Sequence, residues 1–138
     1  MSESKDRQEK RDIESFDDIK VLIDTFYDSV QKDELIGPIF DEKIQNRWPE
    51  HLETMYTFWE TLLLGNHSYK GKPFPPHADL PVEKEHFERW LSLFEKTLNT
   101  LFEGRRTDEA LWRAQNIALM FQRKIKHIRE NPDKPLLI

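Results

Sequence analysis

Apolar residues recur at helical spacing in four long stretches of the chain, and no stretch alternates apolar and polar positions as a strand would. The spacing predicts helices over about residues 16–32, 48–64, 83–102 and 108–129. Each stretch carries a stripe of large apolar side chains on one face, which a surface helix buries against a shared core. The pattern therefore predicts an all-α protein.

Residues that begin and end helices support these boundaries. Ser15 and Asp18 form a candidate capping box, with aspartate in place of the usual glutamate. Pro49 suits the first turn of the second helix, and Gly65 suits its end. Thr107 is the candidate cap of the fourth helix. These signals divide the apolar pattern into four principal helices.

Two stretches between the helices contain helix-breaking residues. Gly37-Pro38 is expected to end the first helical region, so that Ile39 and Phe40 fill the core from a turn. Residues 65–81 hold two glycines and four prolines, which exclude a long regular helix but leave room for a short helical turn. A long irregular loop inside a compact helical domain usually has a function.

The chain is expected to form one domain. Residues 1–14 are almost wholly polar and offer nothing to bury, so we expect them to be disordered. Residues 15–131 hold the four helices, and residues 132–138 form a short C-terminal tail. The helices pack either as two antiparallel pairs in a sandwich or as a simple four-helix bundle, and periodicity does not choose between these.

Composition excludes several classes of protein. The formal net charge of −5 argues against a nucleic-acid binder, which normally carries a basic stripe. The absence of cysteine excludes disulfides and thiolate metal sites. No apolar run approaches the roughly 18 residues of a membrane span, and the N-terminus lacks a signal peptide, so we expect a cytoplasmic protein. An aromatic share of 12% suits either an aromatic core or a pocket around a large, flat group.

His77 is the most informative of the five histidines. It lies in the segment Pro75-Pro76-His77-Ala78-Asp79-Leu80-Pro81, whose prolines restrict the backbone and can aim the imidazole at a fixed point. A haem iron needs such an imidazole, with its second nitrogen hydrogen-bonded so that the tautomer is set. The segment taken alone favours an ordinary surface histidine. No two histidines have the spacing of a zinc HExxH motif, although a non-haem metal site stays open.

Three side chains with polar rings lie on the buried faces of the predicted helices: Tyr27, His51 and Trp90. The Tyr27 hydroxyl and the Trp90 N–H are donors that need partners when they are buried. Two donors directed into one cavity would stabilise a partially negative ligand such as bound dioxygen. Spacing alone favours routine hydrogen bonds to backbone carbonyls.

Other aromatic and basic residues also have two interpretations. Most of the remaining aromatic residues fit core positions better than cofactor contacts: Phe58, Trp59, Phe87, Phe94 and Phe121. Tyr69, Lys70 and Lys72 lie in the loop before His77, from which they can reach the carboxylates of a cofactor. Solvent exposure is the simpler expectation for the two lysines.

Seven short motifs follow one another along the chain. They are Phe26-Tyr27-Asp28-Ser29-Val30, Leu35-Ile36-Gly37-Pro38-Ile39-Phe40, Trp48-Pro49-Glu50-His51, Phe58-Trp59-x-x-Leu62-Leu63-Leu64-Gly65, Tyr69-x-Gly71-x-Pro73, His77-x-Asp79-Leu80-Pro81 and Phe87-x-x-Trp90-Leu91-x-Leu93-Phe94. This ordered set, which covers roughly residues 16–128, resembles the third group of the truncated haemoglobins. The paired glycines that mark other groups are absent, as is usual for the third.

The resemblance implies a truncated globin fold, a sandwich of two helices over two, that binds haem b. It implies that His77 is the proximal ligand of the iron. It places Tyr27, His51 and Trp90 in the distal pocket, with the first and last as donors to bound ligand and His51 as a gate. Further cofactor contacts are expected from Phe26, Trp59, Tyr69, Phe87 and Phe94.

The leading hypothesis is a haem protein that binds dioxygen, nitric oxide or carbon monoxide, as a monomer without nucleic-acid or membrane partners. The first alternative is enzymatic, a nitric oxide dioxygenase or a peroxidase-like enzyme. Because the chain has no flavin- or nicotinamide-binding motif, such an enzyme needs a separate reductase. The second alternative is a non-haem helical interaction module, which predicts an exposed His77.

Overall fold

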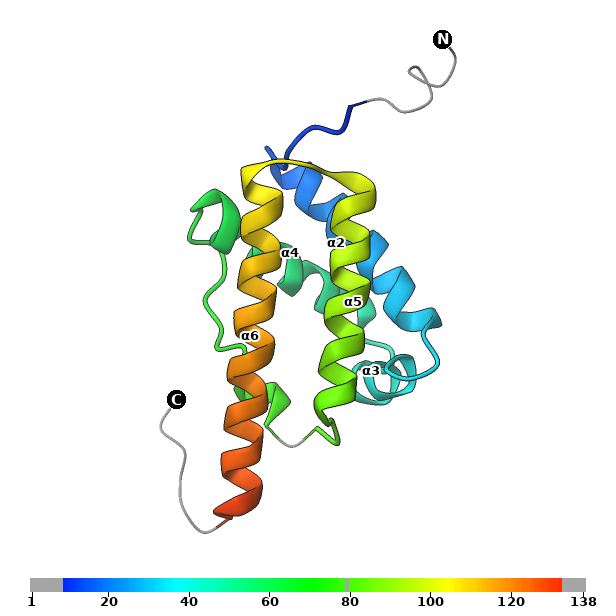
Figure 1. Cartoon of the computed structure of the whole chain (residues 1–138), viewed down its shortest axis with the longest axis vertical. Helices are drawn as coiled ribbons and strands as arrows, with labels where there is room; N and C mark the ends of the chain where they lie inside the picture. The colour runs from blue at the N-terminus through cyan, green and yellow to red at the C-terminus, as the bar shows by residue number, and fades with distance from the viewer. Residues whose placement is uncertain (1–8, 79, 133–138) are drawn as a thin grey trace.

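The computed structural model describes residues 9–78 and 80–132, and this part of the chain contains helices and loops but no strand (Figure 1). Its elements are α2 (Phe16–Lys32), α3 (Gly37–Ile44), α4 (Trp48–Leu64), the short 3-10 helix η1 (Pro75–His77), α5 (Lys84–Leu101) and α6 (Arg105–Glu130). The all-α class is therefore confirmed. None of the helices in these two ranges is long and apolar enough to cross a membrane.

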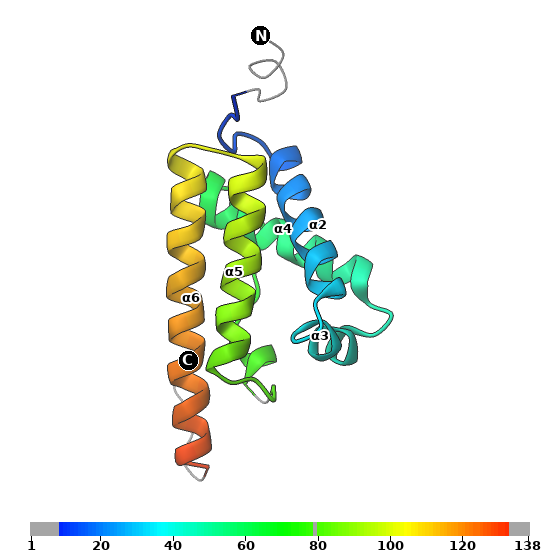
Figure 2. The ribbon, with the colours of Figure 1, turned by 45° about the vertical axis from the view of Figure 1, so that its right-hand side comes forward.

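The four long helices pack as two pairs. α5 and α6 lie side by side and run in opposite directions, joined by a short turn (Figure 1). α2 packs on α4 and also on α5, so that the α2–α4 pair covers the α5–α6 pair (Figure 2). This two-over-two arrangement decides between the two predicted packings in favour of the sandwich.

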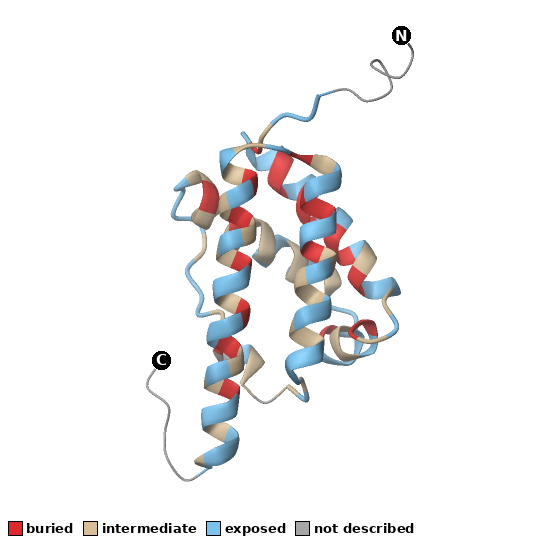
Figure 3. Cartoon of the chain, viewed as in Figure 1, coloured by how far each residue is buried: buried red, intermediate tan, exposed pale blue. Residues whose placement is uncertain are grey.

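The core divides into a large and a small cluster of buried side chains. The large cluster joins α2, α4, α5 and α6, and the buried residues lie on the faces that these helices turn toward one another (Figure 3). The small cluster consists of Phe74, Phe121 and Ile125. It attaches the loop before α5 to the second half of α6 by apolar packing, which matters because this loop carries His77.

Local capping signals begin and end two helices as the sequence predicts. The Ser15 side chain accepts a hydrogen bond from the Asp18 N–H, and the Asp18 carboxylate accepts one from the Ser15 N–H, which completes the capping box of α2. α4 begins with Trp48 and Pro49 in its first turn. It ends before Gly65, whose φ of 78° lies in the left-handed region that glycine adopts freely.

The expectation of a turn after α2 is wrong, because Gly37-Pro38 begins the helix α3 instead of ending one. Pro38 lies in the first turn of α3, where its missing N–H costs no hydrogen bond. The carboxylate of Asp33 holds the preceding turn by accepting from two backbone N–H groups, each at 3.0 Å. Gly37 lets α3 approach the end of α2 closely, since a Cβ there would lie 2.9 Å from the carbonyl oxygen of Val30.

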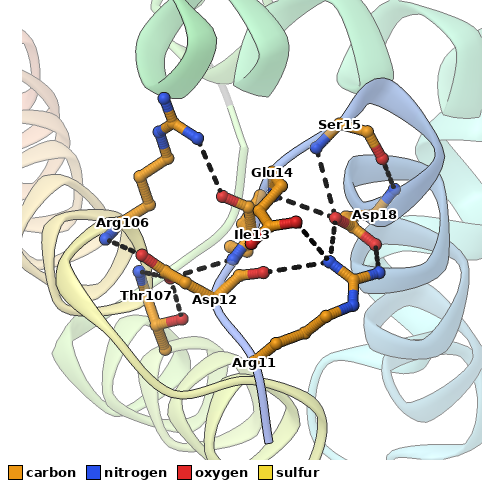
Figure 4. Close-up of polar contacts among 8 residues, drawn as sticks. All are labelled: Arg11, Asp12, Ile13, Glu14, Ser15, Asp18, Arg106 and Thr107. Atoms are coloured by element: carbon orange, nitrogen blue, oxygen red, sulfur yellow. Dashed lines mark hydrogen bonds and ion pairs between the residues drawn. The ribbon is translucent and has the colours of Figure 1, made fainter.

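Ile13 and Asp12 pack against the helices, so the expectation that this segment has nothing to bury is wrong. Ile13 is fully buried in the large core cluster. The Asp12 carboxylate caps α6 by accepting from the backbone N–H of Arg106 at 2.8 Å and of Thr107 at 2.9 Å (Figure 4). The Thr107 hydroxyl donates to the same carboxylate. α6 therefore begins earlier than predicted, and Thr107 is not its cap.

Arg11 attaches the same segment to α2. Its guanidinium donates two hydrogen bonds to the Asp18 carboxylate, at 2.8 and 2.5 Å (Figure 4). This contact, helped by backbone N–H donors, lowers the pKa of the nearly buried Asp18 to about 2. The domain boundary at residue 15 stays a prediction, and the predicted disorder of residues 1–8 and the tail from 133 onward lie outside the described residues.

Replacing Asp18 with asparagine is expected to lower the free energy of unfolding at neutral pH by about 1–2 kcal/mol, because the charged pair with Arg11 is lost. Folding lowers the pKa of Asp18 from 3.8 to about 2, so the carboxylate stabilises the native state above pH 3.8. This contribution disappears as the pH falls toward 2. The difference from the wild type should therefore shrink over that window in urea unfolding. The exposed neighbour Asp17→Asn is the matched control, and an Asp18→Asn difference that is independent of pH would contradict the assignment.

Candidate functional site

A cavity of about 380 Å³ lies between α3 and α4 on one side and α5, α6 and the η1 loop on the other. Pockets for small molecules and cofactors typically have volumes of about 300–1,000 Å³. The wall is mostly apolar, with contributions from Ile39, Phe40, Ile44, Met55, Phe58 and Ile117. Ile39 and Phe40 reach it from α3, so the helix that the sequence analysis missed forms part of the site.

His77 reaches this cavity at the end of η1. Its Nδ1–H donates to the Pro73 carbonyl oxygen at 2.6 Å, so Nδ1 carries the proton and Nε2 keeps a free lone pair. Burial lowers the pKa of His77, the Pro73 carbonyl opposes this shift, and the positive charge of Lys43 lowers the pKa further. A neutral imidazole whose Nδ1 is held by a carbonyl is the form that binds a metal through Nε2.

Packing against α6 sets the orientation of the His77 ring. The ring centroid lies 4.7 Å from that of Phe121 on α6, with an angle of 41° between the planes. The Phe74 ring also packs against Phe121, with the two ring centroids 5.3 Å apart. The backbone N–H of His77 also donates to the Phe74 carbonyl at 2.7 Å. The histidine is therefore half-buried on a fixed turn, not exposed on a free loop.

Tyr27 and His51 meet on the α2–α4 side of the cavity. Their ring centroids lie 5.1 Å apart with the planes nearly perpendicular, and Trp48 packs edge-on against both. Burial raises the pKa of Tyr27, while burial above all, with smaller electrostatic contributions from His77 and Arg47, lowers the pKa of His51 to about 4. Both side chains are therefore neutral near pH 7.

The Nε2 atom of His51 is the one buried side-chain nitrogen or oxygen without a hydrogen-bond partner among the described residues. A polar atom buried without a partner costs about 1–3 kcal/mol, so native structures rarely keep one unless something else binds there. Because His51 lines the cavity, this atom points to a bound group that the protein alone does not supply.

Trp90 lines the cavity from α5 as the outer ring of an aromatic stack. Its ring lies parallel to that of Phe94 at 5.7 Å, and Phe94 stacks on Trp59 at 4.9 Å. Within the described part of the chain, no hydrogen bond engages the Trp90 N–H or the Tyr27 hydroxyl. Two neutral donors therefore remain for a ligand inside an aromatic cavity.

Phe26 and Phe94 do not line the cavity, and their assignment as cofactor contacts stays a prediction. Both are fully buried in the core, where their rings meet edge-on at 5.0 Å. Both rings contact the ring of Trp90, which itself lines the cavity. Trp59, Tyr69 and Phe87 do line the cavity.

Two cations that were not predicted from the sequence also line the cavity, Lys43 and Arg47. They lie at the end of α3 and just after it, and the Arg47 guanidinium donates to the Lys43 carbonyl at 2.8 Å. Lys70 and Lys72 are exposed and are not part of the wall. The only signal was a basic pair four positions apart, which is common on solvated helices and therefore uninformative.

These residues fit a flat, apolar group that carries a metal and anionic substituents. His77 offers one neutral nitrogen, Tyr27 and His51 lie on another wall, and the cations Lys43 and Arg47 also line the cavity. The ranges that the structure describes contain no group of three His, Asp or Glu side chains that would hold a metal ion alone. The non-haem metal centre therefore has no site there, whereas the residues present fit a haem.

A two-over-two helical fold around an apolar cavity with one fixed imidazole defines a globin. The chain matches the family model described as bacterial-like globin over residues 13–122. It is 42% identical over 108 residues to group 3 truncated hemoglobin Ctb of Campylobacter jejuni subsp. jejuni serotype O:2, covering 75% of this chain and 85% of that protein. The crystal structure of group III truncated hemoglobin from Campylobacter jejuni superposes with a TM-score of 0.77 at 38% identity, covering 84% of this chain and 94% of that one.

The chain therefore belongs to the bacterial-like globins, and among them to the truncated haemoglobins of group III. This membership makes it a haem-binding globin and confirms the family that the ordered motifs indicated. It also counts against the non-haem interaction module, whose predicted exposure of His77 is not observed.

Proposed function

We propose that the chain holds haem b in this cavity with His77 as the proximal ligand, and that it binds dioxygen and other diatomic gases such as nitric oxide and carbon monoxide. The observation that carries the proposal is the pair of neutral histidines in one cavity. His77 has its Nδ1 engaged by a carbonyl, and His51 has a buried Nε2 without a partner. Haem, when bound, supplies the iron at which a gas molecule is held.

The residues on the α2–α4 and α5 walls act on the ligand. Burial keeps the Tyr27 hydroxyl protonated, so that it donates a hydrogen bond to a polar ligand together with the Trp90 N–H. Donors fixed in a water-poor pocket stabilise a partially negative ligand strongly, because they need no reorganisation. His51, which is neutral, acts as a gate or as an additional partner. Slow release of ligand follows, and this suits chemistry or sensing better than bulk transport.

The cations on the cavity wall would hold the carboxylates of the cofactor. Lys43 and Arg47 line one edge from α3 and the turn after it, and Tyr69 lines the cavity from the loop. Arginine pairs with a carboxylate through two parallel hydrogen bonds, whereas lysine acts as a point charge. This pairing would fix the rotation of the cofactor within its plane.

A nitric oxide dioxygenase activity is the second candidate. The two donors, Tyr27 and Trp90, favour it because they retain a polar ligand long enough to react. Turnover by such an enzyme then requires a separate reductase. Independently of this activity, we expect the chain to act as a monomer. Stopped-flow mixing of the oxygenated protein with nitric oxide tests this candidate, since slow or absent oxidation leaves binding or sensing as the role.

Titration of the full-length protein with haem is expected to saturate at one haem per chain, with a strong Soret band. The ferrous form should bind dioxygen and carbon monoxide reversibly, as followed by absorption spectra of the ferric, ferrous, oxygenated and carbonylated forms. A chain in which Lys43 and Arg47 are both alanine should bind haem more weakly by about tenfold or more, the effect of losing a charge-assisted pair. Failure of the wild type to bind haem in a fixed ratio would refute the proposal.

A further inference from the structure

The segment that follows His77 is held against α6 by Arg129. Arg129 lies in the last turn of α6, and its guanidinium donates to three acceptors within this short segment. The distances are 3.2 Å to the Leu80 carbonyl, 2.9 Å to the Val82 carbonyl and 2.9 Å to the Glu83 carboxylate. A planar fork of donors suits such a set of acceptors in a way that a lysine does not.

Backbone hydrogen bonds connect the Arg129 contact to His77. The Leu80 N–H donates to the His77 carbonyl at 3.3 Å, while the Leu80 carbonyl accepts from Arg129. On the other side, the His77 N–H and Nδ1–H donate to the carbonyls of Phe74 and Pro73. The histidine is therefore bracketed between a packed turn before it and a segment after it that Arg129 anchors.

We propose that Arg129 is a positioning residue for His77: it would fix the orientation in which the imidazole is presented to a bound haem, without contacting the cofactor. Arg129 is not part of the cavity wall, so its effect is indirect. The inference rests on the proposed function, in which His77 would hold the haem iron. It identifies Arg129 as the residue that attaches the segment after His77 to α6.

The exposure of this contact determines which measurement reports on it. The side chains of Arg129 and Glu83 are 42% and 65% exposed, and ion pairs at such sites contribute little to global stability. Loss of the guanidinium should therefore leave the melting temperature nearly unchanged. Its effect should appear instead in the mobility of the turn and in the iron–histidine bond.

The test compares Arg129→Ala with the wild-type chain and with Arg123→Ala, which removes an exposed arginine from the same helix. In the ferrous, ligand-free protein, resonance Raman spectra report the iron–histidine stretching band. Arg129→Ala should shift and broaden this band, while Arg123→Ala should leave it unchanged. Amide hydrogen exchange over residues 73–83 should become about fivefold faster in Arg129→Ala, the effect of losing a partly exposed hydrogen bond to a charged group.

Two further variants separate the contributions within the contact. Arg129→Lys keeps the charge but loses the fork, so it should lie between the wild type and Arg129→Ala in both measurements. Glu83→Gln keeps the two carbonyl contacts, so it should resemble the wild type more closely than Arg129→Ala does.

An iron–histidine band and exchange rates in Arg129→Ala that match the wild type would overturn the proposal. Failure of the proposed function looks different, because the wild type would then show no iron–histidine band at all. Hydrogen exchange in the haem-free chain still tests the anchoring of the turn in that case. Equal exchange in Arg129→Ala and wild type there would show that the anchor has no effect on the loop.

Discussion

Haem loss should become more than about 100-fold faster when His77 is replaced with glycine. Mutating a residue that is merely hydrogen-bonded to a metal ligand already lowers the affinity for the metal by about 10–100-fold, and here the ligand itself is removed. The fold should persist, because His77 is only half-buried and the small core cluster of Phe74, Phe121 and Ile125 remains. Absorption spectra should lose the features of histidine-ligated haem. Added imidazole, which fits the space left by the side chain, should restore part of them.

The matched control for this variant is His67→Gly. His67 is an exposed histidine in the same loop, and it does not line the cavity. It should leave both the spectrum and the rate of haem transfer to a scavenging protein unchanged. An unaltered Soret band in His77→Gly would mean that another side chain holds the iron, and the assignment of the proximal ligand would fail.

The second large effect is expected on dioxygen dissociation, when a hydrogen-bond donor of the cavity wall is removed. Tyr27→Phe removes the hydroxyl of a side chain that lines the cavity, and this hydroxyl has no hydrogen bond among the described residues. Dioxygen dissociation should accelerate by about 10–100-fold, which corresponds to the loss of a hydrogen bond of about 1.5–3 kcal/mol to a charged acceptor. Carbon monoxide, which is less polarised when bound, should show a smaller change. Laser photolysis and ligand-replacement kinetics measure both rates.

Tyr56→Phe is the control for the loss of a hydroxyl. The Tyr56 hydroxyl donates to the Asp24 carboxylate on α2, and its side chain is not part of the cavity wall. This variant should leave ligand kinetics as they are. Trp90→Phe should act in the same direction as Tyr27→Phe, and a double variant measures whether the two donors act on one ligand. A dioxygen dissociation rate within twofold of the wild type in Tyr27→Phe would argue that its hydroxyl faces away from the ligand.

The helices whose ends depend on local signals were predictable from the sequence. α2 carries its own capping box at Ser15 and Asp18, and α4 carries Pro49 at its start and Gly65 at its end. A few neighbouring residues decide such boundaries, so a single chain suffices to find them. The family resemblance likewise rested on ordered local motifs, and the family match confirms it.

Features that depend on contacts between distant residues were missed. The cap of α6 comes from Asp12, which is more than 90 positions away from Thr107, so no window around the helix start contains it. The sequence predicts a turn in place of α3 because a Gly-Pro pair usually breaks a helix, whereas here Gly37 allows a close approach to α2. Periodicity assigns Phe26 and Phe94 to an inner face but does not tell whether that face meets a cavity or another helix.

The contact between the N-terminal segment and α6 has a practical consequence for how this globin is shortened. The family model begins at residue 13, one position after the carboxylate of Asp12. A fragment cut at that boundary would retain the helices α2 to α6, yet it would leave two amides at the start of α6 without their acceptor and place Ile13 at a fraying end. The free energy of unfolding measured on such a fragment would be lower than that of the intact protein. A fragment that keeps the stability of the intact protein therefore has to begin at Arg11 or earlier.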